Sequence, residues 1–206
     1  MKETTKKKIN KWLWIIVLIP VAGFFLMLFL VGVFTNIPSF RVLENPQTNL
    51  ATELISEDGV VIATFHIENR SYVQYEDLSE SLKNAVLATE DIRFYRHSGI
   101  DFRALARVAV KSLLLGQSSS GGGSTLTQQV AKTLYPRDTS TYDFPGGAAF
   151  KMLVIKMKEW ITAVKLERNY TKEELLTMYL NSIFFGSNAY GIRTAAATFF
   201  DKHPSQ

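Results

Sequence analysis

Two adjacent carboxylates are the first candidates for chemistry, in the segment Glu90-Asp91-Ile92-Arg93-Phe94-Tyr95-Arg96-His97-Ser98-Gly99. Glu90 falls at the end of a predicted helix, beside the apolar face of that helix. A carboxylate in a partly apolar cleft has a raised pKa and can take or give a proton near neutral pH. Taken alone, such a pair is more often a solvated corner, and His97 is more often a structural residue than a base. The segment by itself leaves both interpretations open.

A glycine-rich segment followed by a predicted helix is the second candidate, Gly121-Gly122-Gly123-Ser124-Thr125-Leu126-Thr127-Gln128-Gln129-Val130-Ala131-Lys132. Free N–H groups at the N-terminus of a helix favour phosphate. The segment is not a P-loop, because Gly122 stands where that motif needs lysine. Gln129 and Lys132 are three residues apart and share a helical face. By composition alone, residues 118–123 are equally typical of a flexible linker.

A charged pair within a long apolar-rich helix is the third candidate, in Lys156-Met157-Lys158-Glu159. Lys156 and Glu159 stand at positions i and i+3, so their side chains point the same way. Lys151 lies just over two turns before Glu159. A buried acid beside lysines suits a charged ligand such as pyrophosphate. In isolation, an ordinary surface ion pair remains the alternative.

The composition excludes several other kinds of site. The chain has 206 residues and no cysteine, which rules out disulfides, zinc–thiolate sites and thiol nucleophiles. The three histidines lie far apart and lack the His-Glu-x-x-His spacing of zinc hydrolases. Serine acyl-transfer motifs such as Ser-x-x-Lys are also missing from the sequence. The net charge of +4 comes from the lysines of residues 1–11, so the sequence predicts no basic face for nucleic acid.

A membrane anchor is predicted near the start of the chain. Residues 12–34 carry no charge and would form a helix about 35 Å long, enough to cross a bilayer core of about 30 Å. Trp12 and Trp14 lie at its lysine-rich end, where aromatic rings prefer the interface. A cleaved signal peptide is the alternative, but its apolar run is shorter and ends in small residues. We expect residues 1–11 to form a cytoplasmic tail and residues 35–206 to lie outside.

The remaining residues predict a small β element and then helices. Residues 35–77 read as a juxtamembrane linker and a β-hairpin that turns at Asp58-Gly59, with a third strand at 71–75. One hairpin is not stable alone, so it should pack on the helical residues after it. Residues 78–206 read as a mainly helical domain. Its predicted helix caps are Asp101, Ser124, and Thr171 in a capping box with Glu174.

In their order and spacing, these segments resemble the peptidoglycan glycosyltransferases of glycosyltransferase family 51. These are the polymerase modules of class A penicillin-binding proteins and their monofunctional relatives. The family's motif Glu-Asp-x-x-Phe-x-x-His-x-Gly reads unbroken from Glu90 to Gly99, and Gly-Gly-Ser-Thr-x-Thr-Gln-Gln reads from Gly122 to Gln129. The resemblance covers about residues 50–206. Matches to the third, fourth and fifth motifs are Lys156 with Glu159, Tyr179-Leu180-Asn181, and Gly191 to Lys202.

The resemblance implies a mainly α, lysozyme-like glycosyltransferase domain with a small N-terminal β-hairpin and one N-terminal transmembrane helix. It implies a bacterial cytoplasmic (inner) membrane protein whose catalytic domain faces the extracytoplasmic side. Family members polymerise lipid II into glycan strands, with inversion at the sugar and release of undecaprenyl pyrophosphate. The implied partners are lipid II, the growing glycan strand, the membrane and other cell-wall synthesis proteins, with no nucleic acid.

The resemblance also implies roles for individual residues. Glu90 would be the general base. Glu159 would orient nearby lysines or hold a divalent cation, Mg²⁺ or Mn²⁺, on the diphosphate. The lysines expected to stabilise the diphosphate are Lys132, Lys151 and Lys156. The residues expected to shape the glycan and phosphate sites are Ser124, Thr125, Gln128 and Gln129. The expected structural supports of the Glu90 loop are Asp91, Phe94, His97 and Gly99.

The sequence departs from the family pattern in places, and two other functions stay open. Ile155 stands where the third motif usually has arginine, and Phe199 replaces a common tyrosine. The chain stops at Gln206, before the closing helices of relatives, so we expect a C-terminally incomplete domain. One alternative is a lytic enzyme of lysozyme-like fold, although glycan cleavage has no diphosphate leaving group to match the lysines. The other is an inactive membrane fragment that only contacts cell-wall partners.

Overall fold

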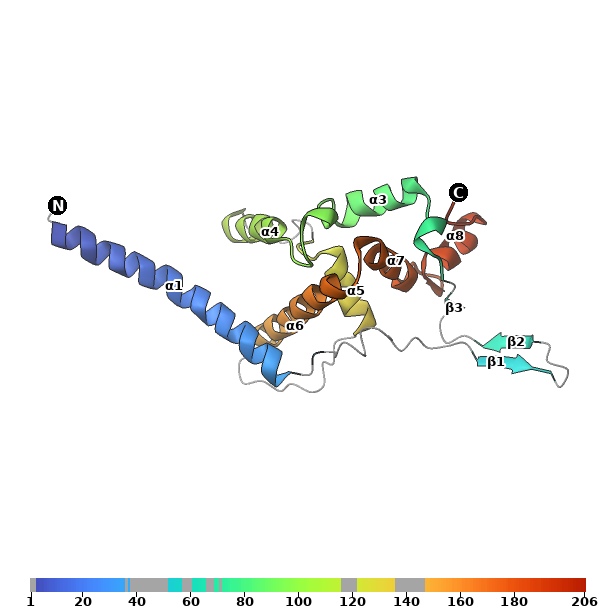
Figure 1. The fold of residues 1–206 in the computed structure, drawn as a ribbon, viewed down its shortest axis with the longest axis horizontal. Coiled ribbons are helices and arrows are strands. Elements are labelled where there is room, and N and C mark those ends of the chain that lie inside the picture. Colours follow the sequence, from blue (N-terminus) through green and yellow to red (C-terminus); the bar gives the residue numbers. More distant parts are fainter. Residues whose placement is uncertain are drawn as a thin grey trace.

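The computed structural model describes residues 3–35, 37, 52–56, 61–65, 69–70, 72–115, 122–135 and 147–206. These residues are mostly helical, as expected, and Figure 1 shows one long helix leading to a group of shorter ones. The helices are α1 (Glu3–Phe34), α3 (Glu80–Glu90), α4 (Phe102–Leu115), α5 (Leu126–Leu134), α6 (Gly147–Asn169), α7 (Lys172–Ser182) and α8 (Ile192–Phe200). The short elements are β1 (Thr52–Ile55), β2 (Val61–Phe65), β3 (Asn69–Arg70), β4 (Ala189–Tyr190) and the 3-10 turns η1 (Tyr75–Asp77) and η2 (Phe94–Arg96).

Helix α1 begins inside the basic tail, at Glu3, and runs unbroken to Phe34. Its part from Lys11 to Phe34 is the one stretch of the described residues long and apolar enough to cross a membrane. Large apolar side chains along it, such as Trp12 and Phe25, are exposed, as expected of a surface that lipid would cover. The predicted tail and anchor therefore share one helix, with no structural break between residues 11 and 12.

The C-terminal half of α1 packs against α6, as Figure 1 shows. Val31 of α1 and Met157 of α6 are buried in a shared apolar cluster. The ring of Phe24 lies 6.1 Å from that of Trp160, measured between centroids. Because α6 also carries the predicted lysine–glutamate pair, this contact joins the apolar helix to an element of the candidate site.

The main core lies where α5, α6 and α7 meet, in the centre of the helical group (Figure 1). Leu126 of α5, Leu166 of α6 and Leu176 of α7 are fully buried there. Phe94 of η2 joins the same cluster at 1% exposure. Burying each such side chain stabilises the fold by about 1.5–3 kcal/mol. The core therefore fixes the loop that follows α3 against the three central helices.

Two of the three predicted helix caps are confirmed. The Asp101 carboxylate accepts hydrogen bonds from the amides of Arg103 and Ala104 at the start of α4. Thr171 and Glu174 form the predicted capping box of α7. Ser124 as the cap of α5 is wrong, because Thr125 occupies that position and its hydroxyl accepts from the Gln128 amide. This one-residue difference frees the Ser124 side chain for another contact.

The β structure agrees with the prediction in part. Strands β1 and β2 pair antiparallel, but the segment around Asp58-Gly59 lies outside the described residues, so the hairpin turn stays a prediction. The third strand at 71–75 is wrong: β3 lies at 69–70, and η1 begins at Tyr75. Strand β3 pairs in parallel with β4 rather than with the β1–β2 pair. Figure 1 shows β1 and β2 to one side of the helices, so the expected packing on the domain is not seen.

The segment before α3 is held by a side chain far along the sequence. The amide nitrogen of Val73 donates to Asn181 Oδ1, and Asn181 Nδ2 donates to the carbonyl of Val73, both at 3.0 Å. One buried asparagine thus satisfies both backbone polar groups of Val73, as a neighbouring strand would. Gly191 packs on the same residue, because an added Cβ would lie 2.9 Å from the Asn181 carbonyl oxygen. The fourth predicted motif therefore joins the linker to the helical domain.

Candidate active site

One groove gathers most of the predicted site residues. It is a cavity of about 640 Å³ bounded by the end of α3, by α4, by the start of α5 and by α6. Glu90 and Glu159, which come from α3 and α6, face this same space. The predicted residues that line it are Glu90, Asp91, Ser124, Thr125, Gln128, Gln129, Lys132, Lys156 and Glu159.

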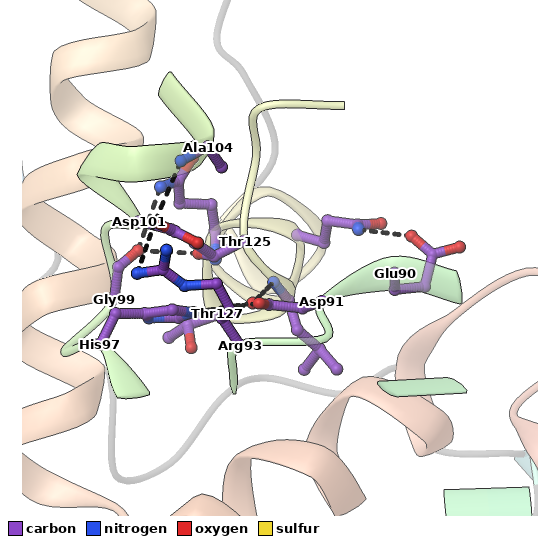
Figure 2. A network of polar contacts seen from close by, with 12 residues as sticks. Glu90, Asp91, Arg93, His97, Gly99, Asp101, Ala104, Thr125 and Thr127 are labelled. Carbon is purple, nitrogen blue, oxygen red and sulfur yellow. Dashed lines mark hydrogen bonds and ion pairs between the residues drawn. The ribbon is translucent and has the colours of Figure 1, made fainter. Parts of the chain in front are cut away.

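Glu90 is the last residue of α3 and is exposed to the groove. Its Oε2 accepts a hydrogen bond of 2.8 Å from Gln129 Nε2, as Figure 2 shows at its right-hand edge. Burial and, to a smaller extent, the negative charge of the nearby Glu90 raise the pKa of Tyr179 to about 12. The Glu90 carboxylate is thus held through one oxygen and is open to solvent. Apolar residues such as Ala88 and Ile92 line the same groove.

Glu159 is buried at 7% exposure, unlike Glu90. Lys156 Nζ donates to Glu159 Oε2 at 2.7 Å and to Ser124 Oγ at 3.1 Å. An ammonium group has three N–H donors, so these two contacts leave one donor of Lys156 for the groove. The predicted i,i+3 pair therefore forms, and it links α6 to the glycine-rich segment before α5.

Asp91 points away from Glu90 into the protein, where its side chain is 5% exposed. Asp91 Oδ2 lies 2.9 Å from His97 Nε2 and also accepts the backbone amide of Leu126 at 3.0 Å. Figure 2 shows Asp91 and His97 in this part of the network. A carboxylate that accepts two such hydrogen bonds at a helix start has its negative charge well satisfied. Asp91 therefore joins the Glu90 loop to the first turn of α5.

The carbonyl of Gly99 forms a second junction between the same loop and α5. It accepts hydrogen bonds from Thr125 Oγ1 at 2.7 Å and from Gln128 Nε2 at 3.0 Å. Thr125 and Gln128 are both buried. Their side chains are thus used at least partly for holding the groove wall, while both residues still line the cavity.

Asp101 adds a buried negative charge beside the groove. Burial alone would raise its pKa, but the amides of Ala104 and Arg103 and the charge of Arg93 together lower the pKa below its ordinary value of 3.8. Arg93 Nη2 lies 3.3 Å from Asp101 Oδ1, a contact drawn in Figure 2. Asp101 therefore stays ionised at neutral pH and neutralises one arginine of the cavity wall.

Sequence reasoning missed three cations of the groove: Arg93, which pairs with Asp101, and two arginines of α4. Arg103 and Arg107 line it from α4, and both are exposed. Neither makes an ion pair with another described residue. Their spacing of four residues places them on one helical face, which is the signal that points to them. Together with Lys132, they give the cavity unneutralised positive charge.

Four predicted residues do not line the groove. Phe94 is buried in the core, and His97 and Gly99 lie behind the wall they support. Lys151 lies near the start of α6, outside the lining residues of the cavity. Among the predicted lysines, the geometry brings together Lys132 and Lys156 but not Lys151.

The predicted divalent cation fits this groove only as an ion shared with a ligand. Across the described part of the chain, no three histidine, aspartate or glutamate side chains gather as a metal site. Mg²⁺, however, is often bound by one or two carboxylates together with phosphates and water. Glu159 offers such a carboxylate, although its Oε2 already accepts from Lys156.

Comparisons with known proteins found a matching family model and several relatives. A family model described as Transglycosylase matches residues 58–206. Penicillin-binding protein 1A of Aquifex aeolicus (strain VF5) is 36% identical over 178 residues, which cover 86% of this chain and 23% of that protein. Penicillin-binding protein 1A of Neisseria gonorrhoeae is 36% identical over 170 residues, covering 82% of this chain and 20% of that protein. Penicillin-binding protein 1F of Bacillus subtilis (strain 168) is 37% identical over 152 residues, covering 74% of this chain and 20% of that protein. The chain thus spans between a fifth and a quarter of the length of these relatives.

Proposed function

This chain belongs to the transglycosylase family, the peptidoglycan glycosyltransferases of family 51, and we propose that its groove polymerises lipid II into glycan strands. In this reaction the 4-hydroxyl of the acceptor N-acetylglucosamine attacks the anomeric carbon of the donor chain. A new glycosidic bond forms as the bond to undecaprenyl pyrophosphate breaks, with inversion at the carbon. The main support is that two carboxylates and several cations, supplied by four elements, line one groove.

Glu90 is the general base of the proposed reaction. It takes the proton of the acceptor hydroxyl as that oxygen attacks. Its exposure and its single hydrogen bond, from Gln129 to Oε2, support this role, because Oε1 makes no hydrogen bond to a described residue. General-base catalysis contributes about 10²–10⁴-fold to a rate. Gln129 fixes the orientation of the carboxylate.

The leaving diphosphate needs charge stabilisation more than it needs a proton. Lys156 has one donor left for it, and Lys132 and Arg103 carry charges that no described acid neutralises. Arg107 adds a fourth cation on the α4 side. Arginine forms two parallel hydrogen bonds to phosphate oxygens, whereas lysine acts as a compact point charge. We assign the diphosphate to this cationic part of the groove.

Glu159 orients Lys156 through their 2.7 Å contact. Glu159 would be the residue to hold a divalent cation, which would supply further neutralisation of the leaving diphosphate. Ser124 is held by Lys156 from the other side. Glu159 and Ser124 both accept hydrogen bonds from Lys156 and so orient its ammonium group.

The apolar helix explains how such a groove meets its substrates. Both substrates are lipid-linked, so the enzyme works at a membrane surface. We propose that Lys11–Phe34 anchors the chain in the bacterial cytoplasmic membrane with the groove on the extracytoplasmic side. The composition of the helix and the lysines before it support this orientation. Other cell-wall synthesis proteins are proposed as further partners.

The test uses the detergent-solubilised chain with labelled lipid II, and the products are separated on a gel. Glu90→Gln keeps the size of the side chain and removes its basicity. We expect this variant to lose about 10²-fold or more of polymerisation, with an unchanged circular-dichroism spectrum. Glu76→Gln, at an exposed glutamate of η1, is the matched control and should retain activity.

Two results would contradict the proposal. Polymer made by Glu90→Gln at the wild-type rate would remove Glu90 from the reaction. Soluble fragments released from finished, lipid-free sacculi, with no polymer from lipid II, would indicate a lytic enzyme instead.

A further inference from the structure

A second polar cluster lies behind the groove, on the opposite side of the loop that follows Glu90. Lys172 Nζ, at the start of α7, donates to Glu167 Oε1 at 2.7 Å and to the carbonyl of His97 at 2.8 Å. Thr127 Oγ1 of α5 donates to the same Glu167 Oε1 at 2.6 Å. None of these residues lines the cavity. The cluster joins the loop to α5, α6 and α7.

Lys172 donates two hydrogen bonds in this cluster, one to Glu167 and one to the carbonyl of His97. Its ammonium group also lies 2.7 Å from the second carboxylate oxygen of Glu167, Oε2. It stands 4.3 Å from the ring centroid of Phe94, a favourable position for a cation. The side chains of Lys172 and Glu167 are 20% and 5% exposed. Because buried ion pairs often stabilise a fold no more than apolar residues would, stability alone does not explain this pair.

The contact between Lys172 and the loop gives the pair a second effect. His97, whose carbonyl Lys172 binds, makes the ring contact to Asp91. Asp91 in turn holds the start of α5 and directly follows Glu90 in the chain. Between Asp91 and His97 the backbone makes only the short 3-10 turn η2. The loop therefore depends on side chains at both ends, and Lys172 is one anchor of the His97 end, beside the contacts of Gly99.

We propose that Lys172 and Glu167 are positioning residues for Glu90, an inference that rests on the proposed function. Their ion pair fixes the His97 end of the loop against α6 and α7. The ring of His97 then holds Asp91, and Asp91 sets the place of Glu90 at the groove. Neither residue touches substrate. Their loss shifts Glu90 relative to the acceptor while the cations that bind the diphosphate stay in place.

Kinetics with lipid II test this inference. Lys172→Met keeps the length of the side chain and removes its charge. Because a misplacement of about 1 Å costs on the order of 100-fold in rate, we expect kcat to fall about 100-fold while KM stays near its wild-type value. Lys172→Arg restores the charge and should recover most of that kcat. A purely structural residue would change the folded fraction instead, so kcat is normalised to the folded protein.

Lys83→Met is a closely matched control. Lys83 is a buried lysine that pairs with Glu80 and lies 4.3 Å from the ring centroid of Tyr75. It therefore repeats much of the chemistry of Lys172, while its direct partners, Glu80 and Tyr75, lie outside residues 91–99. Lys83→Met should lower the melting temperature and leave kcat unchanged. Equal kcat values for Lys172→Met and Lys83→Met would overturn the inference.

Hydrogen exchange separates this inference from the proposed function. Amides of residues 91–99 should exchange faster in Lys172→Met than in Lys83→Met, whatever reaction the protein performs. If wild type makes no polymer, the proposed function fails, and the exchange rates still decide whether Lys172 holds the loop. If Lys172→Met does not fold, Thr127→Val removes one hydrogen bond to Glu167 and should show the same effects in smaller measure. Unchanged exchange and unchanged kcat in Thr127→Val would then refute the positioning role.

Discussion

Gly99 is the point where the Glu90 loop touches the backbone of α6, and replacing it with alanine tests that contact. Its φ is +88°, a region that side chains other than glycine rarely adopt. An added Cβ would lie 2.9 Å from the Ala163 carbonyl carbon and 3.0 Å from its oxygen. Ordinary van der Waals contact begins near 3.4 Å. The loop must therefore move away from α6 by a few tenths of an ångström.

Two costs add up in Gly99→Ala. The positive φ costs about 1–3 kcal/mol for a residue with a side chain. The overlap with the α6 backbone, like other overpacking, costs about 1–3 kcal/mol more. The sum of about 2–6 kcal/mol is a large part of a typical unfolding free energy of about 5–15 kcal/mol. Because the Gly99 carbonyl also holds Thr125 and Gln128, polymerisation should fall as well.

Gly186→Ala separates the two costs. Gly186 has a φ of +90°, and nothing lies within 4 Å of its added Cβ, so only the conformational cost applies. Urea unfolding in detergent, followed by circular dichroism, should show Gly99→Ala to be less stable than Gly186→Ala by about 1–3 kcal/mol. Equal stability of the two variants would mean that the loop does not press against α6, and the assignment of this loop to the groove wall would be wrong.

Three further predictions concern stability, each measured by urea unfolding. The pKa of Asp101 is lowered in the folded protein. Its contribution to the free energy of unfolding is therefore present above pH 3.8, the ordinary pKa, and is lost as the pH falls below that value. Asp101→Asn should remove this acid-induced loss of stability. Asp91→Asn should cost about 1.5–3 kcal/mol, because the charged acceptor of His97 and the Leu126 amide disappears. Met157→Ala should cost about 2–5 kcal/mol by leaving a cavity between α1 and α6.

Each of these three predictions has a result that would contradict it, and two of them have a control variant at an exposed residue. Asp201→Asn changes an exposed residue and should lose stability in acid as the wild type does. If Asp101→Asn lost as much stability in acid, Asp101 would not be the cause of the wild-type loss. For Asp91→Asn, a loss below about 0.5 kcal/mol, the size of an ordinary surface change, would show that the His97 contact contributes little. Met152 is exposed on α6, so Met152→Ala should leave the free energy of unfolding nearly unchanged. An equally small effect of Met157→Ala would contradict the packing of α1 against α6.

Much of the candidate site could be predicted from local spacing. Glu90, the Gln128-Gln129 pair, Lys132 and the Lys156–Glu159 pair were expected from motifs, and all line the groove. The i,i+3 pair forms as predicted because side chains at that spacing share a helical face. Arg103 and Arg107 follow the same rule at a spacing of four, but they lie outside any recognised motif. Lys151 was expected at the site from its distance along the helix, yet it does not line the cavity.

Other features could not be found in the sequence. Thr125 rather than Ser124 caps α5, and the Ser124 hydroxyl accepts instead from Lys156, 32 residues away. Asn181 binds the backbone of Val73 from a position 108 residues away. Lys172 meets the His97 carbonyl across 75 residues. Nothing in the neighbouring residues indicates any of these partners.

Local sequence was enough to specify the apolar length of α1, the caps at Asp101 and Thr171, and the residue types available for chemistry. These features depend on composition and on contacts within four residues, which every segment carries with it. The packing of the helices was needed to bring Glu90 and Glu159 into one groove, to add arginines of α4 to it, and to place the partly buried Lys172 against the loop. Helices that pack around one core bring together side chains that are far apart in the sequence. Local sequence patterns do not predict such pairs, so these contacts are seen only in the folded chain.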